Sequence, residues 1–506
     1  MAIILRPFHF VCLAFLVACS TLSVAQSPPK QTRPNIVWII VDDMSANFSC
    51  YGETTIATPN VDRLAEQGTR FSRAFVTAPV CSPCRSALIT GMYQTTIGAH
   101  HHRSGRGEEK INLPSTVIPI PVLFQQSGYY TCIGDGLGLN ESKKKKQSLG
   151  KTDYNFEWDA SMYDGPDWSG RKAGQPFFMQ VQLQGGKLRG GTDASAQQLS
   201  KKAETEFGQS VHPEKVTLPP YYPRDPVLLR DWAAYLDAVR FTDQHVGKVV
   251  DRLQSEGLLD NTVVIFMTDH GISHARGKQF LYNEGTHVPL IVRGPKVPAG
   301  NVRDDLVEHI DLAAISLAAA GIAIPKTMQS KNVLAKNYIP REAVFAARDR
   351  CDETVERLRS IRTEKFLYIR NFYPNRPHLQ PNAYKDDKSI LKSLRALHAQ
   401  GQLSELTEKL LFSPTRPAEE LYAWQEDPWQ IQNLAKDPQW ESVVQEMRMK
   451  LAQWMTDTVD MGPETSSRYD SDMKVYLGDI TKQKDGKVET LLKNIEQMKQ
   501  WEREGK

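Results

Sequence analysis

The chain has 506 residues, of which 40% are hydrophobic and 24% are charged, and its formal net charge is +3. This length suffices for one large α/β domain and a smaller second domain. A nearly neutral chain lacks the global basic field that nucleic-acid binders use, so we expect no nucleic-acid partner, and any recognition of anions must be local.

The N-terminus carries an export signal. Arg6 precedes an apolar run over residues 8–18, which is too short for a permanent transmembrane helix. The small residues at 23–25 predict cleavage after Ala25, which assigns residues 1–25 to a signal peptide. Residues 16–19 (LVAC) also fit a lipoprotein processing box, which would place cleavage after Ala18 and a lipid anchor on Cys19. We expect an exported protein, periplasmic or secreted, with no transmembrane segment.

Strand and helix patterns alternate through the first two thirds of the chain. Apolar β-branched runs predict strands over residues 35–41, 71–77, 176–183, 262–267 and 288–292. Helical patterns begin at Thr58-Pro59-Asn60 and near Ser82, and a longer one covers residues 231–256. This alternation predicts an α/β domain over residues 33–340 with a mostly parallel central sheet between helices.

Composition changes after about residue 340. Residues 360–370 predict a strand and residues 440–454 a helix, so we expect a smaller C-terminal α+β domain over residues 341–480. The tail over residues 481–506 is charged, and we expect it to pack loosely. The lysine run 143–146 predicts a solvated loop.

The segment Cys81-Ser82-Pro83-Cys84-Arg85-Ser86 combines sulfur chemistry with an anion site. Pro83 suits the first turn of a helix, which places Cys81 at a helix N-terminus where free N–H groups favour anions. Arg85 lies one turn inside and can reach back. Three interpretations remain open: a thioredoxin-type redox pair, half of a zinc site that lacks its second Cys-x-x-Cys, and a Cys-x-Pro-x-Arg motif.

Acidic residues follow two of the predicted strands. Asp42-Asp43 ends the strand at 35–41, and Thr268-Asp269-His270-Gly271 follows the strand at 262–267. Active sites of α/β proteins form at these carboxyl ends, and hard oxygen ligands suit Ca²⁺ or Mg²⁺ better than zinc. A single carboxylate pair can be a helix cap, but two acidic strand ends beside such a cysteine helix are harder to explain that way.

Together these blocks resemble the sulfatase family, in which the motif cysteine is oxidised to formylglycine. The resemblance covers roughly residues 33–440 in order. It includes Asn35–Asp43, Thr58–Ala65, Cys81–Ser86, Thr268–Gly271, Gly277–Gly285, Glu420–Tyr422 and Asn433–Pro438. It implies an alkaline-phosphatase-like fold whose smaller C-terminal domain carries an antiparallel sheet. It also implies hydrolysis of sulfate monoesters and maturation by a formylglycine-generating enzyme.

The resemblance also implies roles for individual residues. One divalent cation, Ca²⁺ or alternatively Mg²⁺, would be bound by Asp42, Asp43, Asp269 and His270 together with the modified Cys81. Family members more often have Asn where His270 stands. Arg85 would hold the hydrated aldehyde, and Lys278 would contact a sulfate oxygen.

Two positions depart from the common family pattern. Many relatives have Gly-Lys-x-His after a strand like residues 128–131, and here Gly150-Lys151-Thr152-Asp153 resumes that motif after an insertion. Lys151 would then contact sulfate, although it could also be an ordinary surface lysine. Where relatives present a histidine after the strand at 176–183, this chain offers Lys187, and His274 could serve instead as a substrate contact. The general acid therefore stays open between Asp153, Lys187 and His274.

Three other functions compete with a sulfatase acting on a sulfated small molecule or, preferably, a sulfated carbohydrate. A phosphonate or phosphate ester hydrolase would use the same metal and nucleophile. A thiol–disulfide oxidoreductase would use Cys81 and Cys84 and need no metal. A glycan-binding protein without catalysis is expected if Cys81 is never modified.

Overall fold

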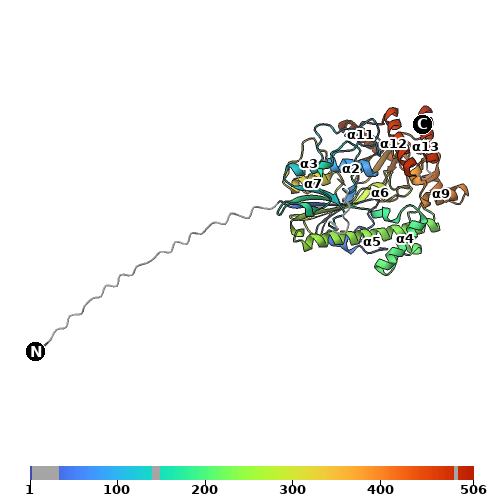
Figure 1. The fold of residues 1–506 in the computed structure, drawn as a ribbon. Helices are drawn as coiled ribbons and strands as arrows, with labels where there is room; N and C mark the ends of the chain where they lie inside the picture. Colours follow the sequence, from blue (N-terminus) through green and yellow to red (C-terminus); the bar gives the residue numbers. More distant parts are fainter. Residues whose placement is uncertain (3–32, 139–148, 484–487) are drawn as a thin grey trace. The chain divides into compact units, whose positions relative to one another are not determined.

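The computed structural model describes residues 1–2, 33–138, 149–483 and 488–506, and the fold lies within Arg33–Lys506 (Figure 1). The predicted signal peptide, Cys19 and the lysine run 143–146 lie outside the described residues. No helix in the described part of the chain is long and apolar enough to span a membrane.

An eight-stranded sheet forms the centre of the larger domain, in the order β3-β4-β1-β5-β6-β2-β7, with β8 paired to β2. Only β6 runs antiparallel to its neighbours, which confirms the predicted mostly parallel sheet. The strands are β1 (Asn35–Val41), β2 (Thr69–Phe75), β3 (Tyr130–Gly134), β4 (Phe177–Leu183), β5 (Thr262–Thr268), β6 (His287–Arg293), β7 (Asn301–Arg303) and β8 (Val307–Glu308).

Both faces of this sheet are buried, because side chains alternate along each strand and both sets are apolar. In β1, Val37, Ile39 and Val41 join one hydrophobic cluster, whereas Ile36, Trp38 and Ile40 join another. The first cluster is covered by α1 (Pro59–Glu66), α4 (Asp193–Phe207) and α5 (Pro226–Ser255). The second is covered by α2 (Cys81–Thr90), α3 (Ile120–Gln126) and α7 (Asp311–Ala319), on the opposite side of the sheet in Figure 1.

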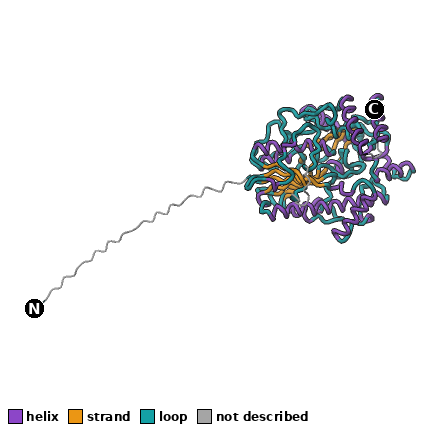
Figure 2. The backbone as a smooth tube through the Cα atoms, in the orientation of Figure 1, coloured by secondary structure: helices purple, strands orange, loops and turns teal. Residues whose placement is uncertain are grey.

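A second sheet lies in the C-terminal part of the chain and is antiparallel, as expected (Figure 2). Its order is β12-β11-β10-β9, with strands β9 (Ala343–Arg348), β10 (Leu358–Thr363), β11 (Leu367–Asn371) and β12 (Glu419–Tyr422). The single strand predicted over residues 360–370 is wrong, because the chain reverses between β10 and β11 and Thr363 N–H donates to the Phe366 carbonyl at 2.9 Å. The helix α11 (Glu441–Asp457) packs on this sheet.

The described residues of the C-terminal tail belong to two helices that pack together. The helices α12 (Ser466–Gln483) and α13 (Val488–Arg503) pack on each other through Tyr469, Met473, Leu491 and Met498. The expected loose packing is therefore wrong for α13, since its apolar residues recur at helical spacing and find partners on α12. The remaining short helices are α6 (Asn283–Thr286), α8 (Ala383–Asp386), α9 (Ser389–Ala399) and α10 (Glu405–Thr407).

Candidate active site

Two pairs of ionisable residues meet at one edge of the central sheet. Asp42 and Asp43 follow β1, and Asp269 and His270 follow β5, which is the parallel neighbour of β1. The Asp269 N–H donates to the Val41 carbonyl at 2.8 Å, which places the ends of β1 and β5 side by side. All four side chains are buried. Asp43 has a φ of 51°, a left-handed conformation that non-glycine residues rarely adopt outside functional or tightly constrained positions.

Cys81 opens α2 beside these carboxylates. The residue before it, Val80, is extended and provides no side-chain cap, so the first-turn N–H groups face the site without one. Cys81 Sγ lies 3.1 Å from His270 Nε2 and 3.6 Å from Asp42 Oδ1. The expected position of Cys81 at a helix N-terminus is therefore observed.

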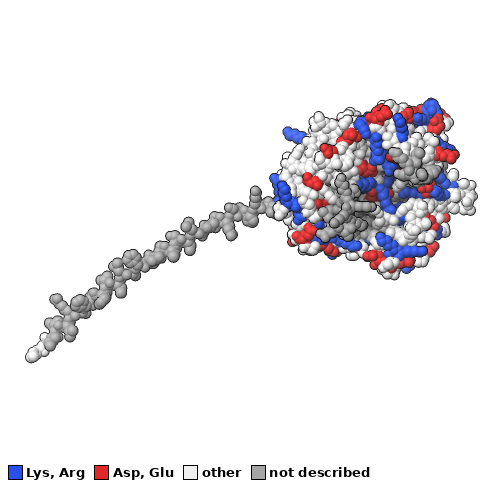
Figure 3. Space-filling model, viewed as in Figure 1, with Lys and Arg blue, Asp and Glu red and all other residues white. Residues whose placement is uncertain are grey.

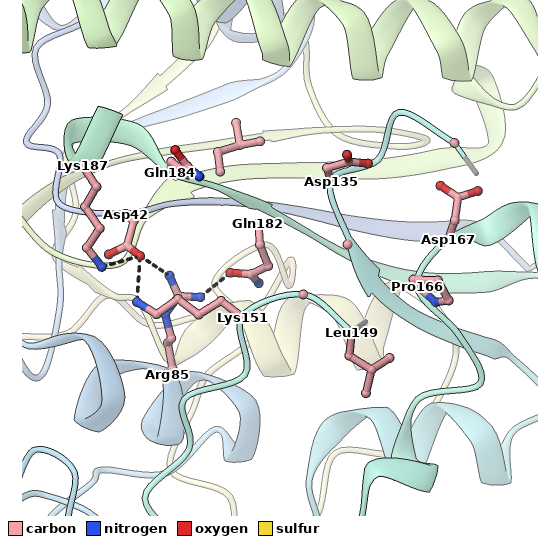
Figure 4. Close-up of a pocket in the computed structure, with 14 residues that line it drawn as sticks. Asp42, Arg85, Asp135, Leu149, Lys151, Pro166, Asp167, Gln182, Gln184 and Lys187 are labelled. Atoms are coloured by element: carbon pink, nitrogen blue, oxygen red, sulfur yellow. Dashed lines mark hydrogen bonds and ion pairs between the residues drawn. The ribbon is translucent and has the colours of Figure 1, made fainter. Parts of the chain in front are cut away.

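Four cations surround this group. Lys278 Nζ lies 2.8 Å from Asp43 Oδ1 and 3.1 Å from Cys81 Sγ. The other three converge on Asp42, as Figure 4 shows. The distances to Asp42 Oδ2 are 2.7 Å from Lys151 Nζ, 2.8 Å from Lys187 Nζ and 3.5 Å from an Arg85 guanidinium nitrogen. Arg85 also pairs with Asp269 at 2.8 Å.

The lysines and Arg85 dominate the protonation of the buried acids. Burial alone would raise the pKa of Asp42, but Lys151, Arg85 and the other cations hold it well below its usual range. Burial likewise raises the pKa of Cys81, yet Lys151, Lys187 and Lys278 lower it to about 7. For His270, burial lowers the pKa, and the charges of Asp269 and Cys81 outweigh it and raise the pKa.

The acidic cluster has the donor chemistry of a divalent-cation site. Asp42, Cys81, Asp269 and His270 each offer one ligand atom, and these atoms all lie within 4.8 Å of one another. Asp43 Oδ1 lies 3.3 Å from His270 Nε2, so it borders the same space. A buried set dominated by carboxylate oxygens fits a hard cation such as Ca²⁺ or Mg²⁺.

The site opens into a cavity of about 610 Å³. Arg85, Lys151 and Lys187 line one side of it, and Asp135 and Asp167 line the other (Figure 4). A band of Lys and Arg side chains also crosses the face of the molecule drawn in Figure 3. The cavity thus has cations on the side of Asp42 and carboxylates on the opposite side.

Two other predicted residues lie outside this cluster. His274 Nε2 contacts Asp231 Oδ2 at 2.7 Å and packs against Trp232, and its pKa is lowered to about 4 because burial outweighs the pull of Asp231. Among the described residues, His274 has no contact with Cys81 or the four cations. Asp153 accepts a hydrogen bond from Arg106 at 2.7 Å and lies 3.9 Å from Lys151.

Gln182 was not predicted from the sequence as a site residue, yet its amide oxygen accepts a hydrogen bond from Arg85. Gln180 and Gln182 alternate with apolar residues in β4, and this polar alternation inside a buried strand was the available signal. His102 was not predicted either; it contacts the Ser82 hydroxyl at 2.6 Å and so supports the start of α2.

The geometry argues against the redox interpretation of Cys81 and Cys84. Cys84 is fully buried, and burial raises its pKa well above the usual value, so its reactive thiolate is disfavoured. The five cysteines in the described part of the chain are all free thiols.

Known proteins resemble this chain over most of its length. A family model described as Sulfatase matches residues 34–322, and one described as N-sulphoglucosamine sulphohydrolase, C-terminal, matches residues 270–412. An ulvan-active sulfatase of Formosa agariphila is 29% identical over 463 residues, covering 84% of this chain and 75% of that protein. The N-sulphoglucosamine sulphohydrolase of Homo sapiens is 27% identical over 489 residues, covering 88% and 94%.

Solved structures share the fold. A 2-O glycosaminoglycan sulfatase matches with a TM-score of 0.60 at 19% identity, covering 85% of this chain and 93% of that chain. The phosphonate monoester hydrolase of Agrobacterium radiobacter matches with a TM-score of 0.57 at 16% identity, covering 84% and 96%. These likenesses concern the architecture alone, and they confirm the expected alkaline-phosphatase-like fold.

Proposed function

Because this chain belongs to the sulfatase family, we propose that it hydrolyses sulfate monoesters of sulfated carbohydrates, with residue 81 as the nucleophile. The observation that carries the proposal is the position of Cys81, which opens α2 among four cations, three of which line an adjoining cavity. The carbohydrate class is supported by the names of the relatives, an ulvan-active sulfatase and an N-sulphoglucosamine sulphohydrolase.

Two groups implied by the family fit the residues present. Formylglycine at position 81 would supply an oxygen nucleophile through its hydrated aldehyde. We assign Asp42, Asp43, Asp269 and His270, with residue 81, to one divalent cation. We favour calcium because carboxylate oxygens dominate the donor set, and the cation would supply positive charge beside the nucleophile.

The chain's own residues gather and orient the sulfate. Arg85, Lys151, Lys187 and Lys278 carry four positive charges against the three negative charges of Asp42, Asp43 and Asp269. This local excess attracts an anion although the whole chain is nearly neutral. Preorganised cations stabilise developing negative charge without reorganising during the reaction. Gln182 holds one guanidinium nitrogen of Arg85, which fixes its orientation.

Lys187 is placed to hydrogen-bond the sugar oxygen that carries the sulfate. Its Nζ lies 3.8 Å from Cys81 Sγ and lines the cavity. Burial lowers the pKa of Lys187, but the charges of Cys81 and Asp43 raise it overall, so the amine keeps its proton and acts as a charged hydrogen-bond donor rather than as a general acid. Asp153 pairs with Arg106 and His274 pairs with Asp231, so both of these side chains are engaged elsewhere.

We also propose that the protein is exported and matured by a formylglycine-generating enzyme. This follows from the predicted signal peptide over residues 1–25 and from the Cys81–Arg85 motif.

The test combines mass spectrometry with a substrate screen. The chain is co-expressed with a formylglycine-generating enzyme, and the peptide holding residue 81 should lose about 18 Da as the thiol becomes an aldehyde. The modified protein should then release sulfate from sulfated oligosaccharides faster than it cleaves matched phosphate and phosphonate esters, and Cys81→Ala should abolish the release. An unmodified Cys81 under these conditions would sink the formylglycine mechanism, and faster phosphonate cleavage would replace the proposed substrate.

A further inference from the structure

A second cluster of metal-ligand residues lies outside the active site. His100 and His101 belong to the loop after α2, and Asp349 directly follows β9. The two segments meet because His102 N–H donates to the Arg350 carbonyl at 2.8 Å. One ligand atom from each of His100, His101 and Asp349 lies within 4.8 Å of the others. The three residues are 5%, 3% and 2% exposed, so water has little access to them.

Several polar atoms of this cluster have no hydrogen-bond partner. His100 Nε2 lies 2.7 Å from the Gly462 carbonyl, which requires the proton on Nε2 and leaves a lone pair on Nδ1. Among the described residues, that Nδ1, both ring nitrogens of His101 and Asp349 Oδ1 have no hydrogen-bond partner. Glu464 Oε1 lies 3.9 Å from His101 Nδ1, too far for a hydrogen bond. Buried polar atoms normally have partners, so several unpartnered atoms in one small cluster indicate a missing ligand.

The charges around the cluster favour a cation. Two buried arginines pair with four buried carboxylates there, namely Arg350 with Glu464 and Asp472, and Arg359 with Asp349 and Asp460. This set has two more negative than positive charges. Arg357 also lies close enough to interact with Asp349 and Asp460, which leaves an excess of one negative charge, and Arg468 pairs with Glu109 at 3.5 Å. A divalent cation would offset the buried excess.

We propose that His100, His101 and Asp349 bind one divalent transition-metal ion, with zinc the best match. Two imidazoles and one carboxylate are typical zinc ligands, whereas calcium requires a shell of oxygen atoms. The Gly462 carbonyl fixes the tautomer of His100, as backbone carbonyls do for metal-binding histidines. The ion would join the loop after α2, the end of β9 and the segment around Gly462.

This site also has a connection to the nucleophile. His102, the next residue along, contacts the Ser82 hydroxyl at 2.6 Å, and Ser82 adjoins Cys81. A metal at residues 100 and 101 would therefore hold in place the loop that supports the first turn of α2. Its role is structural, since it touches none of the residues assigned to the reaction.

The substitution His101→Leu separates a metal site from an empty cluster. Without a metal, replacing a buried imidazole that has no partner by an apolar side chain should leave the protein as stable or more stable. With a metal, the same change removes a ligand, so the melting temperature should fall and the bound metal should be lost. His398→Leu, at an exposed position of α9 where the imidazole pairs with Glu408, is the control for a histidine outside the cluster.

The experiment measures metal content of the full chain after expression with zinc and dialysis against excess calcium, which occupies the hard-ligand site. We expect one retained zinc equivalent in the unsubstituted chain, in His398→Leu and in the active-site variant Asp269→Asn, and its loss in His101→Leu and Asp349→Asn. Because a variant could fail to fold, Co²⁺ is also titrated into the metal-depleted unsubstituted chain, where one equivalent should give the intense visible absorption of a four-coordinate ion. The proposal is overturned if neither zinc nor cobalt is held under excess calcium, or if His101→Leu retains the ion.

Discussion

Lys278 and Lys187 both reach residue 81, but they differ in exposure to solvent. Lys278 Nζ lies 3.1 Å from Cys81 Sγ, and its side chain is 5% exposed. Lys187 Nζ lies 3.8 Å away, and its side chain is 35% exposed. Two unit charges about 4 Å apart attract by about 4 kcal/mol at an effective dielectric constant of about 20, and by about 1 kcal/mol in bulk water. Lys278 is close to the first limit, and solvent screening brings Lys187 towards the second.

These magnitudes predict a ranking of activity losses. Replacing Lys278 by Met should lower kcat/KM by about 10³-fold, whereas Lys187→Met should lower it by about 5-fold to 10-fold. The assay is the initial rate of sulfate release from a sulfated oligosaccharide under saturating calcium, normalised to the formylglycine content of each preparation. Lys248→Met, at an exposed position on α5, should leave the rate unchanged.

Lys278→Met also removes the ammonium that neutralises buried Asp43, so thermal unfolding of each variant must accompany the rates. A rate loss in a variant that is folded at the assay temperature reports on the reaction. The electrostatic reasoning fails if Lys187→Met is as damaging as Lys278→Met, or if Lys278→Met stays within tenfold of the unsubstituted enzyme.

Three further predictions concern the buried Glu284, the buried thiol of Cys84 and the tightly packed Gly271. Burial raises the pKa of Glu284 from 4.5 to about 7, so between these pH values the folded protein holds a proton that the unfolded chain has lost. The free energy of unfolding should therefore fall by up to about 3 kcal/mol as the pH rises from 4.5 to about 7. The variant Glu284→Gln should lack this loss of stability, and its amide oxygen can still accept the hydrogen bond from Tyr221. Urea unfolding at about pH 5 and about pH 8 measures the difference. A variant with the same pH dependence as the unsubstituted protein would contradict the prediction. Cys84→Ala should keep activity within about twofold and cost about 1–2 kcal/mol of unfolding free energy, since Cys84 only fills space, and an inactive but folded variant would restore the redox interpretation. A Cβ on Gly271 would lie 1.7 Å from the Glu284 carbonyl oxygen, so Gly271→Ala should lower the free energy of unfolding by more than about 3 kcal/mol. Gly478→Ala, at an open position in a helix, is the control and should raise it by up to about 1 kcal/mol, as thermal unfolding would measure.

Local patterns made much of the fold predictable. The unbroken apolar run of β1 indicated a strand buried on both faces, and Pro83 indicated where α2 begins. The chain reversal between β10 and β11 was not predicted, because residues 363–366 (TEKF) contain none of the usual turn residues. The packing of α13 was not predicted because the partners of its apolar residues lie on another helix, which the sequence of α13 does not reveal.

The site was predictable where a motif fixed a position relative to a strand or helix end. This holds for the convergence of Asp42, Asp269 and Cys81, since parallel strand ends share one edge of a sheet. His274 was different, because its environment is set by Asp231, which is 43 positions away in the chain. A histidine bound to such a distant carboxylate has no local signature in the sequence.

The sharing of Asp42 by several cations has a consequence for double substitutions. Lys151 and Lys187 come from different segments, yet both contact the same oxygen, Oδ2. When one is removed, the other still neutralises the carboxylate, so either single variant understates what the pair contributes. Their free-energy effects are therefore coupled, and the double variant loses more than the sum of the two single losses. The free energy that these two lysines contribute is therefore shared between two separate segments of the chain, and either one partly replaces the other.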